Sequence, residues 1–523
     1  MKTPIPVIDI FAGPGGLGEG FASFANAQGR SPFHITLSIE KDATAYQTLL
    51  LRAFYRQFPV GSVPFQYYEH LRGKVERRTL FKLYPNEAKI ASEEAWQQEL
   101  RRRSHDRVKQ RIGRSLGKNA TWVLIGGPPC QAYSLAGRSR IKKIKKKSKK
   151  KKRDRRHYLY REYLKIIADH KPPVFVMENV KGLLSSTTGK KGNRIFKKIY
   201  RDLQDPIRAI YGKRRKALTY KIFPLVKPAK GPSKVEPSDY IIRAERFSVP
   251  QSRHRVILLG IRSDLDIIPG KLRSYPRFIT VQEVISDLPR LRSALSRGLD
   301  STTEWVDTLL AVETRKWFSA IRGVLGPRIR RELSLTLRKL EKERLSTGSE
   351  FVRSPIRIKR LRRWYYDKDL KGACNHTARS HIPKDLHRYL FASCFAKVLG
   401  RSPTLKDFPR TLLPKHKNVS KARKQSLFSD RFRVQLLGKP ASTITSHISK
   451  DGHYFIHPDS SQCRSLTVRE AARLQTFPDN YFFAGMRTAQ YEQVGNAVPP
   501  YLARQIAKIV YDVLLQASNG VDR

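Results

Sequence analysis

The chain has 523 residues and a formal net charge of +60, from 104 Lys and Arg against 44 Asp and Glu. It contains only four cysteines and no Cys-x-x-Cys pair, which argues against a disulfide scaffold and against a zinc ribbon. Its first residues, MKTPIPVIDI, lack the layout of a signal peptide. No apolar run reaches the ~18 residues that a membrane span requires, so we expect a cytoplasmic protein with no membrane partner.

The excess of basic residues favours a polyanionic partner, and nucleic acid is the first candidate. Residues 138–156, RSRIKKIKKKSKKKKRDRR, hold 14 basic residues and one acidic residue, yet the rest of the chain still carries +47. The alternative is a general basic bias that keeps the protein soluble. The block itself cannot bury a core, so it is either a flap that closes on a phosphate backbone or a solvated surface loop.

Over residues 1–262, short apolar runs alternate with helix-like stretches, which predicts an α/β domain with a mostly parallel sheet. We expect strands at IPVIDI (5–10), HITLSI (34–39), WVLI (122–125), VFVM (174–177) and RVILLGI (255–261). Residues 93–112 predict an exposed, charged helix. Residues 290–430 predict a separate basic module, in which the apolar residues follow no clear helical or strand period. PPYLARQIAKIVYDVLLQ (499–516) predicts a helix that a proline pair opens. Its apolar face comprises Leu502, Ile506, Ile509, Val510, Val513 and Leu514.

The first chemical motif is DIFAGPGGLGEGF (9–21), in which Gly13, Gly15 and Gly18 fit G-x-G-x-x-G between a strand and a helix. Glycines at these positions allow a tight turn and a close approach of the backbone to a ligand. The next predicted strand ends in Glu40, where a carboxylate would hold ribose hydroxyls. NAD, FAD and S-adenosylmethionine sites share these features, and a purely structural turn is a further alternative.

The second motif is GGPPCQAYS (126–134), in which Pro128 and Pro129 restrict the backbone just before Cys130. A nucleophile that must meet its substrate at a fixed angle benefits from such a mounting. A free thiol has a pKa near ~8.5, so its attack requires an activated electrophile. The alternative is an inert, buried cysteine at the end of a strand.

Two further motifs place charged side chains at strand ends. VFVMENVKGLL (174–184) ends a predicted strand in Glu178, which could protonate a ring nitrogen if burial raises its pKa, or merely cap a helix. QSRHRVILLGIR (251–262) begins a strand with Arg253 and Arg255. If that strand runs antiparallel to the others, both arginines converge on Glu178 and Cys130. Exposed arginines on an edge strand are the alternative.

In this order, the glycine turn, PPCQ, ENV and QxRxR resemble the DNA (cytosine-5) methyltransferase family, in particular its bacterial, restriction-modification-like members. RSLTVREAARLQTFPDNYFF (464–483) and YEQVGNAVPPYLARQIA (491–507) resemble the late motifs of that family. The similar blocks cover about half of the chain.

The resemblance implies a class I S-adenosylmethionine-dependent methyltransferase fold, which is α/β and Rossmann-like, with a separate target-recognition domain. We expect a catalytic and cofactor-binding domain over 1–290 with a basic loop insert at 138–157. We expect the target-recognition domain over 291–430 and a C-terminal segment, 431–523, that returns to the catalytic domain.

The resemblance also implies the chemistry. Cys130 would add to carbon 6 of a flipped cytosine, Glu178 would stabilise the protonated N3, and Arg255 with Arg253 would hold O2. The cofactor S-adenosylmethionine would contact the glycine turn, the ribose carboxylate, the PPCQ block and the late motif: Phe11, Ala12, Gly13, Gly15, Gly16, Leu17, Glu40, Pro128, Asn496 and Val498. The DNA substrate would contact Pro129, Gln131, Ser134, Asn179, Val180 and Gln493.

The implied partner is double-stranded DNA, bound by a monomer, with a cognate restriction endonuclease encoded separately. Three alternatives stay open. A tRNA cytosine-5 methyltransferase of the same family is the nearest, although the long middle module favours DNA. A nicotinamide dehydrogenase leaves PPCQ, ENV and QxRxR unused, and an inactive chromatin- or RNA-binding protein explains the charge alone.

Three local features remain to be placed. Cys374, His376, His381 and His387 do not have the spacing of a zinc site, so we expect no metal. We expect His447, His453 and His457 to form local hydrogen bonds or to contact DNA. The family's carboxylate for the cofactor adenine, at the end of the third strand, cannot be assigned within VPFQYYEHLRG (63–73).

Overall fold

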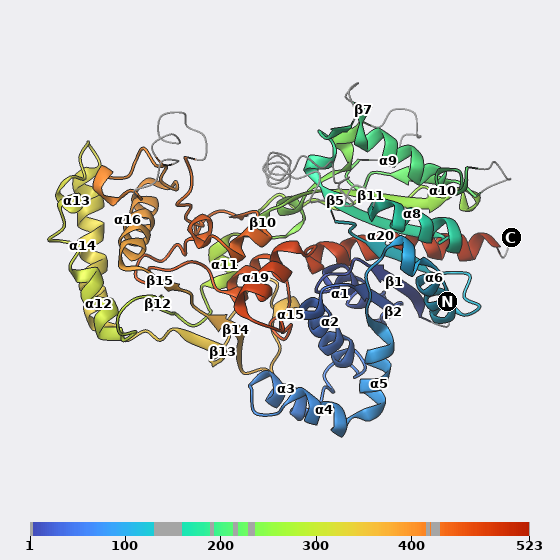
Figure 1. Cartoon of the computed structure of the whole chain (residues 1–523), viewed down its shortest axis with the longest axis horizontal. Helices are drawn as coiled ribbons and strands as arrows, with labels where there is room; N and C mark the ends of the chain where they lie inside the picture. Colours follow the sequence, from blue (N-terminus) through green and yellow to red (C-terminus); the bar gives the residue numbers. More distant parts are fainter. Residues whose placement is uncertain are drawn as a thin grey trace. The chain divides into compact units, whose positions relative to one another are not determined.

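The computed structural model divides the chain into two compact units (Figure 1). The described residues are 4–129, 159–188, 193–212, 218–227, 236–414, 419 and 429–521. Unit 1 comprises Met1–Ser62, Phe81–Arg277 and Ala497–Arg523, and unit 2 comprises Val63–Leu80 and Phe278–Asn496. These bounds differ from the expected ones, because only residues 497–523 of the C-terminal segment return to unit 1.

The core of unit 2 explains this difference. Phe432, Val434 and Ile456 are buried in one hydrophobic cluster with the helix α16 (Pro383–Leu399), so the segment after residue 430 is part of the same unit. Near the N-terminal end of the chain, the hydroxyl of Tyr68 donates to Asp367 Oδ2 over 2.9 Å, which ties residues 63–80 to unit 2.

Among the described residues, the sheet of unit 1 contains eight strands, in the order β3-β2-β1-β4-β5-β11-β8, with β9 paired to β11. All five predicted strands are confirmed as β1 (Ile5–Ile10), β2 (Phe33–Glu40), β4 (Val123–Gly126), β5 (Val174–Val180) and β11 (His254–Arg262). The strands β3 (Ala95–Gln97), β8 (Tyr220–Phe223) and β9 (Ile241–Arg243) were not predicted. β1 to β5 pair in parallel, whereas β11 is antiparallel to its three neighbours. This is the α/β, mostly parallel sheet of a class I methyltransferase fold.

Helices cover both faces of this sheet, because the strand side chains alternate between two cores. Ile5 and Val7 of β1 belong to one hydrophobic cluster, together with α1 (Gly16–Ala22) and α20 (Pro500–Val521). Ile8 and Ile10 belong to the other cluster, together with α6 (His105–Leu116), α8 (Leu159–His170) and α9 (Ile195–Gln204). The sheet is therefore the middle layer of three.

Two predicted helices have different outcomes. The C-terminal helix is confirmed as α20, and every residue of its predicted apolar face is buried. The helix predicted over 93–112 is wrong, since these residues contain the end of α5 (Pro85–Glu94), the strand β3 and the start of α6. β3 is too short to show a period of its own, and α6 buries Val108, Ile112 and Leu116 on one face.

Unit 2 is built around the long helices α14 (Gly326–Lys342) and α16, which pack through residues such as Leu333 and Leu390. β13 (Gly348–Arg353) and β14 (Gly372–Thr377) form an antiparallel pair, and β12 (Ala294–Leu295) pairs in parallel with β15 (Ser380–His381). The other helices of this unit are α3 (Phe65–Leu71), α11 (Val281–Ile285), α12 (Thr302–Leu310), α13 (Lys316–Ser319), α15 (Arg362–Tyr365), α18 (Val468–Leu474) and α19 (Arg487–Asn496).

The remaining helices and strands are mostly short. They are α2 (Ala43–Tyr55), α4 (Arg77–Leu83), α10 (Pro206–Tyr211), β6 (Thr187–Thr188), β7 (Asn193–Arg194), β10 (Gln251–Ser252) and β16 (Ala441–Ser442). Within the described part of the chain, no helix has the length and apolar character needed to cross a membrane.

Candidate active site

The glycine turn between β1 and α1 has an unusual backbone. Phe11, Gly13 and Gly15 adopt φ angles of 54°, 58° and 92°, a region that favours glycine. The Gly13 N–H donates to Glu40 Oε2 over 2.8 Å, while Glu40 Oε1 accepts from the N–H groups of Lys41 and Asp42. The predicted ribose carboxylate therefore lies beside the predicted glycine turn, and Glu40 Oε2 keeps a lone pair for a ligand hydroxyl.

The late motif lies against this turn. A Cβ atom on Gly16 would come 2.2 Å from the carbonyl oxygen of Val498, so only glycine fits there. Leu17, the next residue, is buried in the core under the turn. The turn thus brings together Gly16 and Val498, which are 482 residues apart and were both predicted as cofactor-binding residues.

A carboxylate that the sequence analysis missed supports the same turn. Asp9 lies on β1, is fully buried, and its Oδ2 accepts from the Gly18 N–H over 3.2 Å. Burial raises the pKa of Asp9 to about 8, against smaller lowering effects of this hydrogen bond and of Arg56. Its Oδ1 has no hydrogen-bond partner among the described residues. An aspartate inside the apolar run IPVIDI was the signal that could have identified it.

Glu178 and Arg255 form the charged centre of the candidate site. Arg255 Nε lies 2.9 Å from Glu178 Oε1, and both side chains are 13% exposed. β11 is antiparallel to β5, as the prediction required, so Arg255 at its start faces Val180 near the end of β5. Burial raises the pKa of Glu178, although the charges of Arg255 and Arg253 oppose this rise. A buried acid with a raised pKa suits proton donation near neutral pH.

The two arginines do not converge on Glu178 in the same way. Arg253 is fully buried, and its Nη2 donates to the carbonyl oxygen of Ala497 over 2.8 Å. Arg253 therefore binds the segment that reaches the glycine turn, whereas Arg255 binds the acid. The influence of Arg253 on Glu178 is electrostatic.

The start of the PPCQ motif lies beside the ENV motif. β4 and β5 are neighbours, and a Cβ atom on Gly127 would come 3.1 Å from Glu178 Oε2. The buried Pro128 accepts a 3.4 Å hydrogen bond at its carbonyl oxygen from Asn179 Nδ2, and Asn179 Oδ1 accepts from the Val180 N–H. Pro129, which is half-buried, is the last described residue before the predicted nucleophile.

The other predicted site residues lie in three different parts of the chain. Cys130, Gln131, Ser134 and the basic insert 138–157 lie outside the described residues. Asn496 and Gln493 lie on α19 of unit 2, where Gln493 Nε2 donates to the carbonyl oxygen of Ala484 over 2.9 Å. Phe11 and Ala12 lie in the glycine turn, and the Ala12 N–H donates to the carbonyl oxygen of Ile39 at the end of β2.

A carboxylate also follows the third strand of the sheet, whereas the sequence analysis looked for such a carboxylate in residues 63–73. Residues 63–73 do not precede the end of a strand, because they contain α3 of unit 2. The third strand is β3, which pairs in parallel with β2, and Glu99 follows it by two residues. The Gln98 N–H donates to the carbonyl oxygen of Glu40, which keeps Glu99 at the same sheet edge. A strand of three residues gave no detectable pattern.

Several histidines of the predicted middle and C-terminal segments have structural partners. His376 contacts Thr467 Oγ1 and the carbonyl oxygen of Pro289, and His387 contacts the carbonyl oxygen of Thr308. Among the described residues, no group of three or more His, Cys, Asp or Glu side chains could hold a metal ion. His453 contacts the hydroxyl of Tyr389, and His457 accepts from the Asp459 N–H.

Comparisons with known proteins agree with this geometry. The sequence matches the family described as C-5 cytosine-specific DNA methylase over residues 86–205 and 236–511. It is 34% identical to the type II methyltransferase M.Bpa9945I of Bacillus paralicheniformis, over 97% of this chain and 99% of the relative. It is 25% identical to the type II methyltransferase M1.HphI of Haemophilus parahaemolyticus (96% and 86% covered). It is 26% identical to the DNA (cytosine-5-)-methyltransferase M.ApeKI of Aeropyrum pernix (75% and 81% covered).

Proposed function

The chain belongs to the C-5 cytosine-specific DNA methylase family, and from this premise we propose that it methylates carbon 5 of a flipped cytosine in a specific duplex sequence through a covalent Cys130 adduct. The enzyme class, DNA (cytosine-5-)-methyltransferase, follows from the family itself. The observation that carries the proposed mechanism is the Glu178–Arg255 pair beside Gly127 and Pro128, at the entrance to the PPCQ motif.

The glycine turn fits S-adenosylmethionine as the cofactor. A Cβ atom on Gly13 would meet no heavy atom of the described residues within 4 Å, so the turn has open space above it. Glu40 offers an acceptor for ribose hydroxyls, and Glu99 is the candidate acceptor for the adenine amino group. Phe11 and Pro128 would contact the adenine ring, and Val498 would complete the site. When bound, the cofactor supplies an electrophilic methyl group.

The residues of the chain would activate the cytosine. Carbon 5 of cytosine is a poor nucleophile, and addition of the Cys130 thiolate to carbon 6 would turn it into an enamine carbon. Glu178 would donate its proton to N3 as the adduct forms, and Arg255 would hold O2. Arg253 would position the segment at Ala497. Once carbon 5 is methylated, a water molecule would take its proton as the Cys130 thiolate leaves carbon 6. N3 would then return its proton to Glu178, which restores the neutral aromatic ring and the acid.

Unit 2 is the candidate for the recognition of the DNA sequence, because it is basic and is inserted between the motifs of unit 1. Two of the relatives above are type II methyltransferases by name. On that basis the biological role proposed here is the modification enzyme of a restriction-modification system in the cytoplasm, acting as a monomer, with its endonuclease encoded separately.

Bisulfite sequencing tests this proposal. DNA from cells that express the wild-type protein should contain protected cytosines in one sequence context, and DNA from cells that express Cys130→Ser should contain none. Methyl incorporation into duplex DNA and into tRNA, measured side by side, is the control for the substrate class. Incorporation into tRNA alone, or equal protection by the Cys130→Ser variant, would contradict the proposal.

A further inference from the structure

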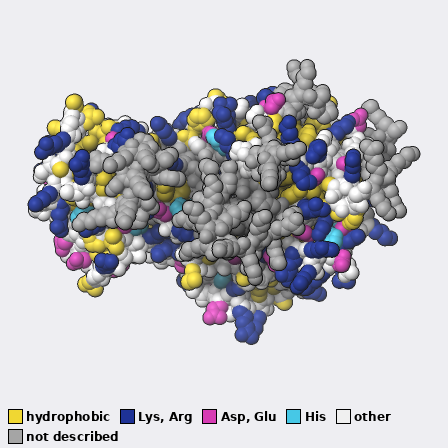
Figure 2. All heavy atoms as spheres, turned by 45° about the horizontal axis from the view of Figure 1, so that its top comes forward, with side chains coloured by type: hydrophobic (Ala, Val, Ile, Leu, Met, Phe, Trp, Pro, Cys, Tyr) yellow, Lys and Arg dark blue, Asp and Glu magenta, His cyan; other side chains and the backbone are white. Residues whose placement is uncertain are grey.

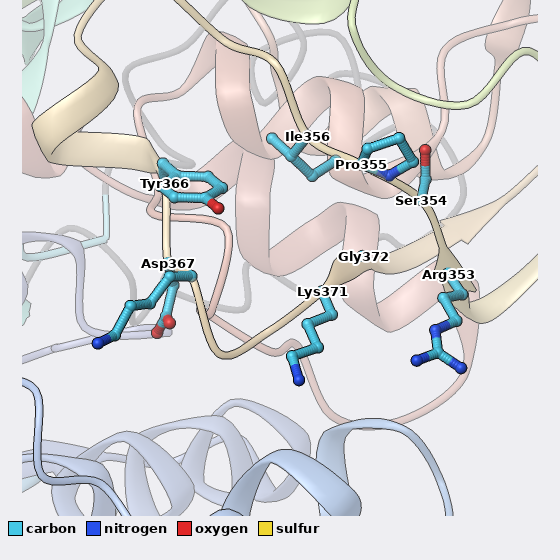
Figure 3. A pocket seen from close by; sticks show the side chains of 9 residues that line it. Arg353, Ser354, Pro355, Ile356, Tyr366, Asp367, Lys371 and Gly372 are labelled. Atoms are coloured by element: carbon cyan, nitrogen blue, oxygen red, sulfur yellow. The ribbon is translucent and has the colours of Figure 1, made fainter.

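Unit 2 contains a pocket of about 390 Å³ that has no role in the reaction described above. It lies between the end of β13 and the start of β14, and Figure 3 shows its lining side chains. Ser354, Pro355, Ile356 and Gly372 line one part of it, and Tyr366 contributes an aromatic ring. The remaining lining residues are charged: Arg353, Asp367, Lys368 and Lys371.

The pocket is electropositive. Arg353, Lys368 and Lys371 are exposed, and within the described part of the chain none of the three forms an ion pair with a carboxylate. The single acid, Asp367, is already occupied, because its Oδ2 accepts from Tyr68 Oη (2.9 Å) and Asn480 Nδ2 (2.7 Å). Its Oδ1 accepts from the Asp369 N–H. Three free cations against one occupied carboxylate leave a net charge of +2 that an anion can neutralise.

The backbone holds two of these cations side by side. Arg353 faces Gly372 in the β13–β14 pair, and the Ser354 N–H donates to the carbonyl oxygen of Lys371. In Figure 3 the charged ends of Arg353 and Lys371 extend in the same direction. Lys371 adopts a φ of 56°, which a side chain as large as lysine seldom accepts.

The loop that carries Lys368 and Lys371 is anchored from α3. Arg72 donates through Nη2 to the carbonyl oxygens of Asp369 and Leu370, and Tyr68 donates to Asp367. These contacts fix the loop before any ligand arrives, so binding would cost little conformational entropy. The Tyr366 ring is also fixed, because the Arg362 guanidinium lies 4.0 Å from its centroid.

We propose that this pocket binds one phosphodiester of the DNA backbone, with Arg353, Lys368 and Lys371 on the phosphate and the deoxyribose packed against Tyr366. The proposal rests on the proposed function, since it requires that the protein binds duplex DNA. A phosphate contact of this kind positions the protein on the duplex and is independent of sequence. Each such contact contributes about 0.9 to the slope of log K against log salt.

The test compares Lys371→Gly with Lys171→Gly. Lys171 is also an exposed lysine with a positive φ, of 50°, but it lies in unit 1, between α8 and β5. Both variants lose one charge and gain the same relief of backbone strain, so only the position relative to the pocket differs. Affinity for a fluorescein-labelled duplex is measured by anisotropy over a salt series, with thermal melting and wild-type methyl transfer alongside.

Lys371→Gly should melt at or above the wild-type temperature, bind about 5- to 10-fold more weakly, and lower the salt slope by about 0.9. Arg353→Gln should act in the same direction, and Lys171→Gly should keep the wild-type slope. If Lys371→Gly binds DNA with the same affinity and salt slope as the wild-type protein, the pocket assignment is wrong. Methyl transfer by the wild-type protein would still uphold the proposed function in that case. A loss restricted to one DNA sequence would overturn the backbone contact, because it would indicate base reading.

Discussion

At the scale of single residues, the site combines an acid whose pKa is raised by burial with a cation that opposes this rise. Glu178 lies at a strand end where burial raises its pKa, and Arg255, 2.9 Å away, pulls it down. The pair therefore suits an acid that must donate to a ring nitrogen near neutral pH.

Removal of the arginine charge should shift the pH profile upward. Arg255→Gln removes the effect that lowers the pKa of Glu178, so the protonated acid persists to higher pH and the alkaline limb of the methyl-transfer rate moves up. The rate itself should fall about 10- to 100-fold, because a charge-assisted contact is lost. Single-turnover methyl transfer over a pH series measures both.

Two further variants define this experiment. Glu178→Gln should lower the rate by about 10²- to 10⁴-fold and remove the alkaline limb, because the amide cannot transfer a proton. Glu245→Gln changes another carboxylate of unit 1, which pairs with His254, and should keep the wild-type profile. A limb that survives in Glu178→Gln would assign the titration to a different group.

Asp9 should make the stability of the protein depend on pH. Its pKa is about 8 in the folded chain and 3.8 ordinarily, so the folded state holds a proton that the unfolded state releases. The free energy of unfolding should therefore fall as the pH rises from about 4 to about 8, by up to about 1.4 kcal/mol per pH unit. Asp9→Asn removes this contribution. Urea unfolding should show equal stability of the two proteins near pH 4 and a more stable variant near pH 8, and parallel curves would contradict this.

At the scale of elements, the short helix α1 has glycines where it approaches its neighbours. A Cβ atom on Gly20 would lie 2.3 Å from Ala503 Cβ and 2.5 Å from the carbonyl oxygen of Pro500. A Cβ atom on Gly18, a glycine of the predicted G-x-G-x-x-G motif, would lie 3.0 Å from Asp9 Oδ2. Gly20 therefore lets α1 pack closely on α20, and Gly18 lets it pack closely on β1. Gly13 differs from both, because it leaves open space at the turn.

Gly20→Ala should therefore destabilise the protein, by about 1–3 kcal/mol, because the methyl group meets backbone and a fixed side chain. Gly113→Ala is the matched control. Gly113 lies in α6, and a Cβ atom there would meet nothing within 4 Å, so this variant should gain about 0.5–1 kcal/mol from helix propensity. Chemical denaturation measures both, and a neutral Gly20→Ala would disprove the close contact.

The elements also show what the sequence could predict. Buried strands such as β1 and β11 appeared as apolar runs, and α20 appeared through its helical period. β3 could not be found, because three residues carry no period, and so Glu99, which follows this strand, was not considered as a candidate carboxylate. Asp9 was missed because its role depends on a hydrogen bond to Gly18, which only the folded turn creates.

At the scale of the whole molecule, the boundaries of the two units do not coincide with the boundaries of the sequence motifs. Ala497 and Val498 return to unit 1, whereas the preceding Asn496 belongs to unit 2. The segment 63–80 joins unit 2 through Tyr68 and Arg72, contacts across about 300 positions that composition does not reveal. The motif order therefore predicted that Arg255 lies beside Glu178, but not where the units begin and end.

The positive charge of the molecule is spread along the chain and over the visible surface. Figure 2 shows Lys and Arg side chains spread over the visible face, with few acidic side chains between them. This agrees with a net charge of +60 that remains strongly positive without the 138–156 block. A positive field along the whole chain favours rapid, non-specific association with DNA. Phosphate contacts such as the one proposed at Lys371 would then fix the position of the protein along the duplex.

The central claim is that Cys130 forms a covalent bond with the target cytosine beside Glu178 and Arg255. The most direct measurement is mass spectrometry of the protein after reaction with cofactor and a duplex that carries 5-fluorocytosine at the methylated position. The fluorine replaces the proton that must leave, so the thiolate cannot be expelled. We predict a stable adduct on the peptide that contains Cys130. An adduct on another residue, or none in a protein that methylates the unmodified duplex, would contradict the account.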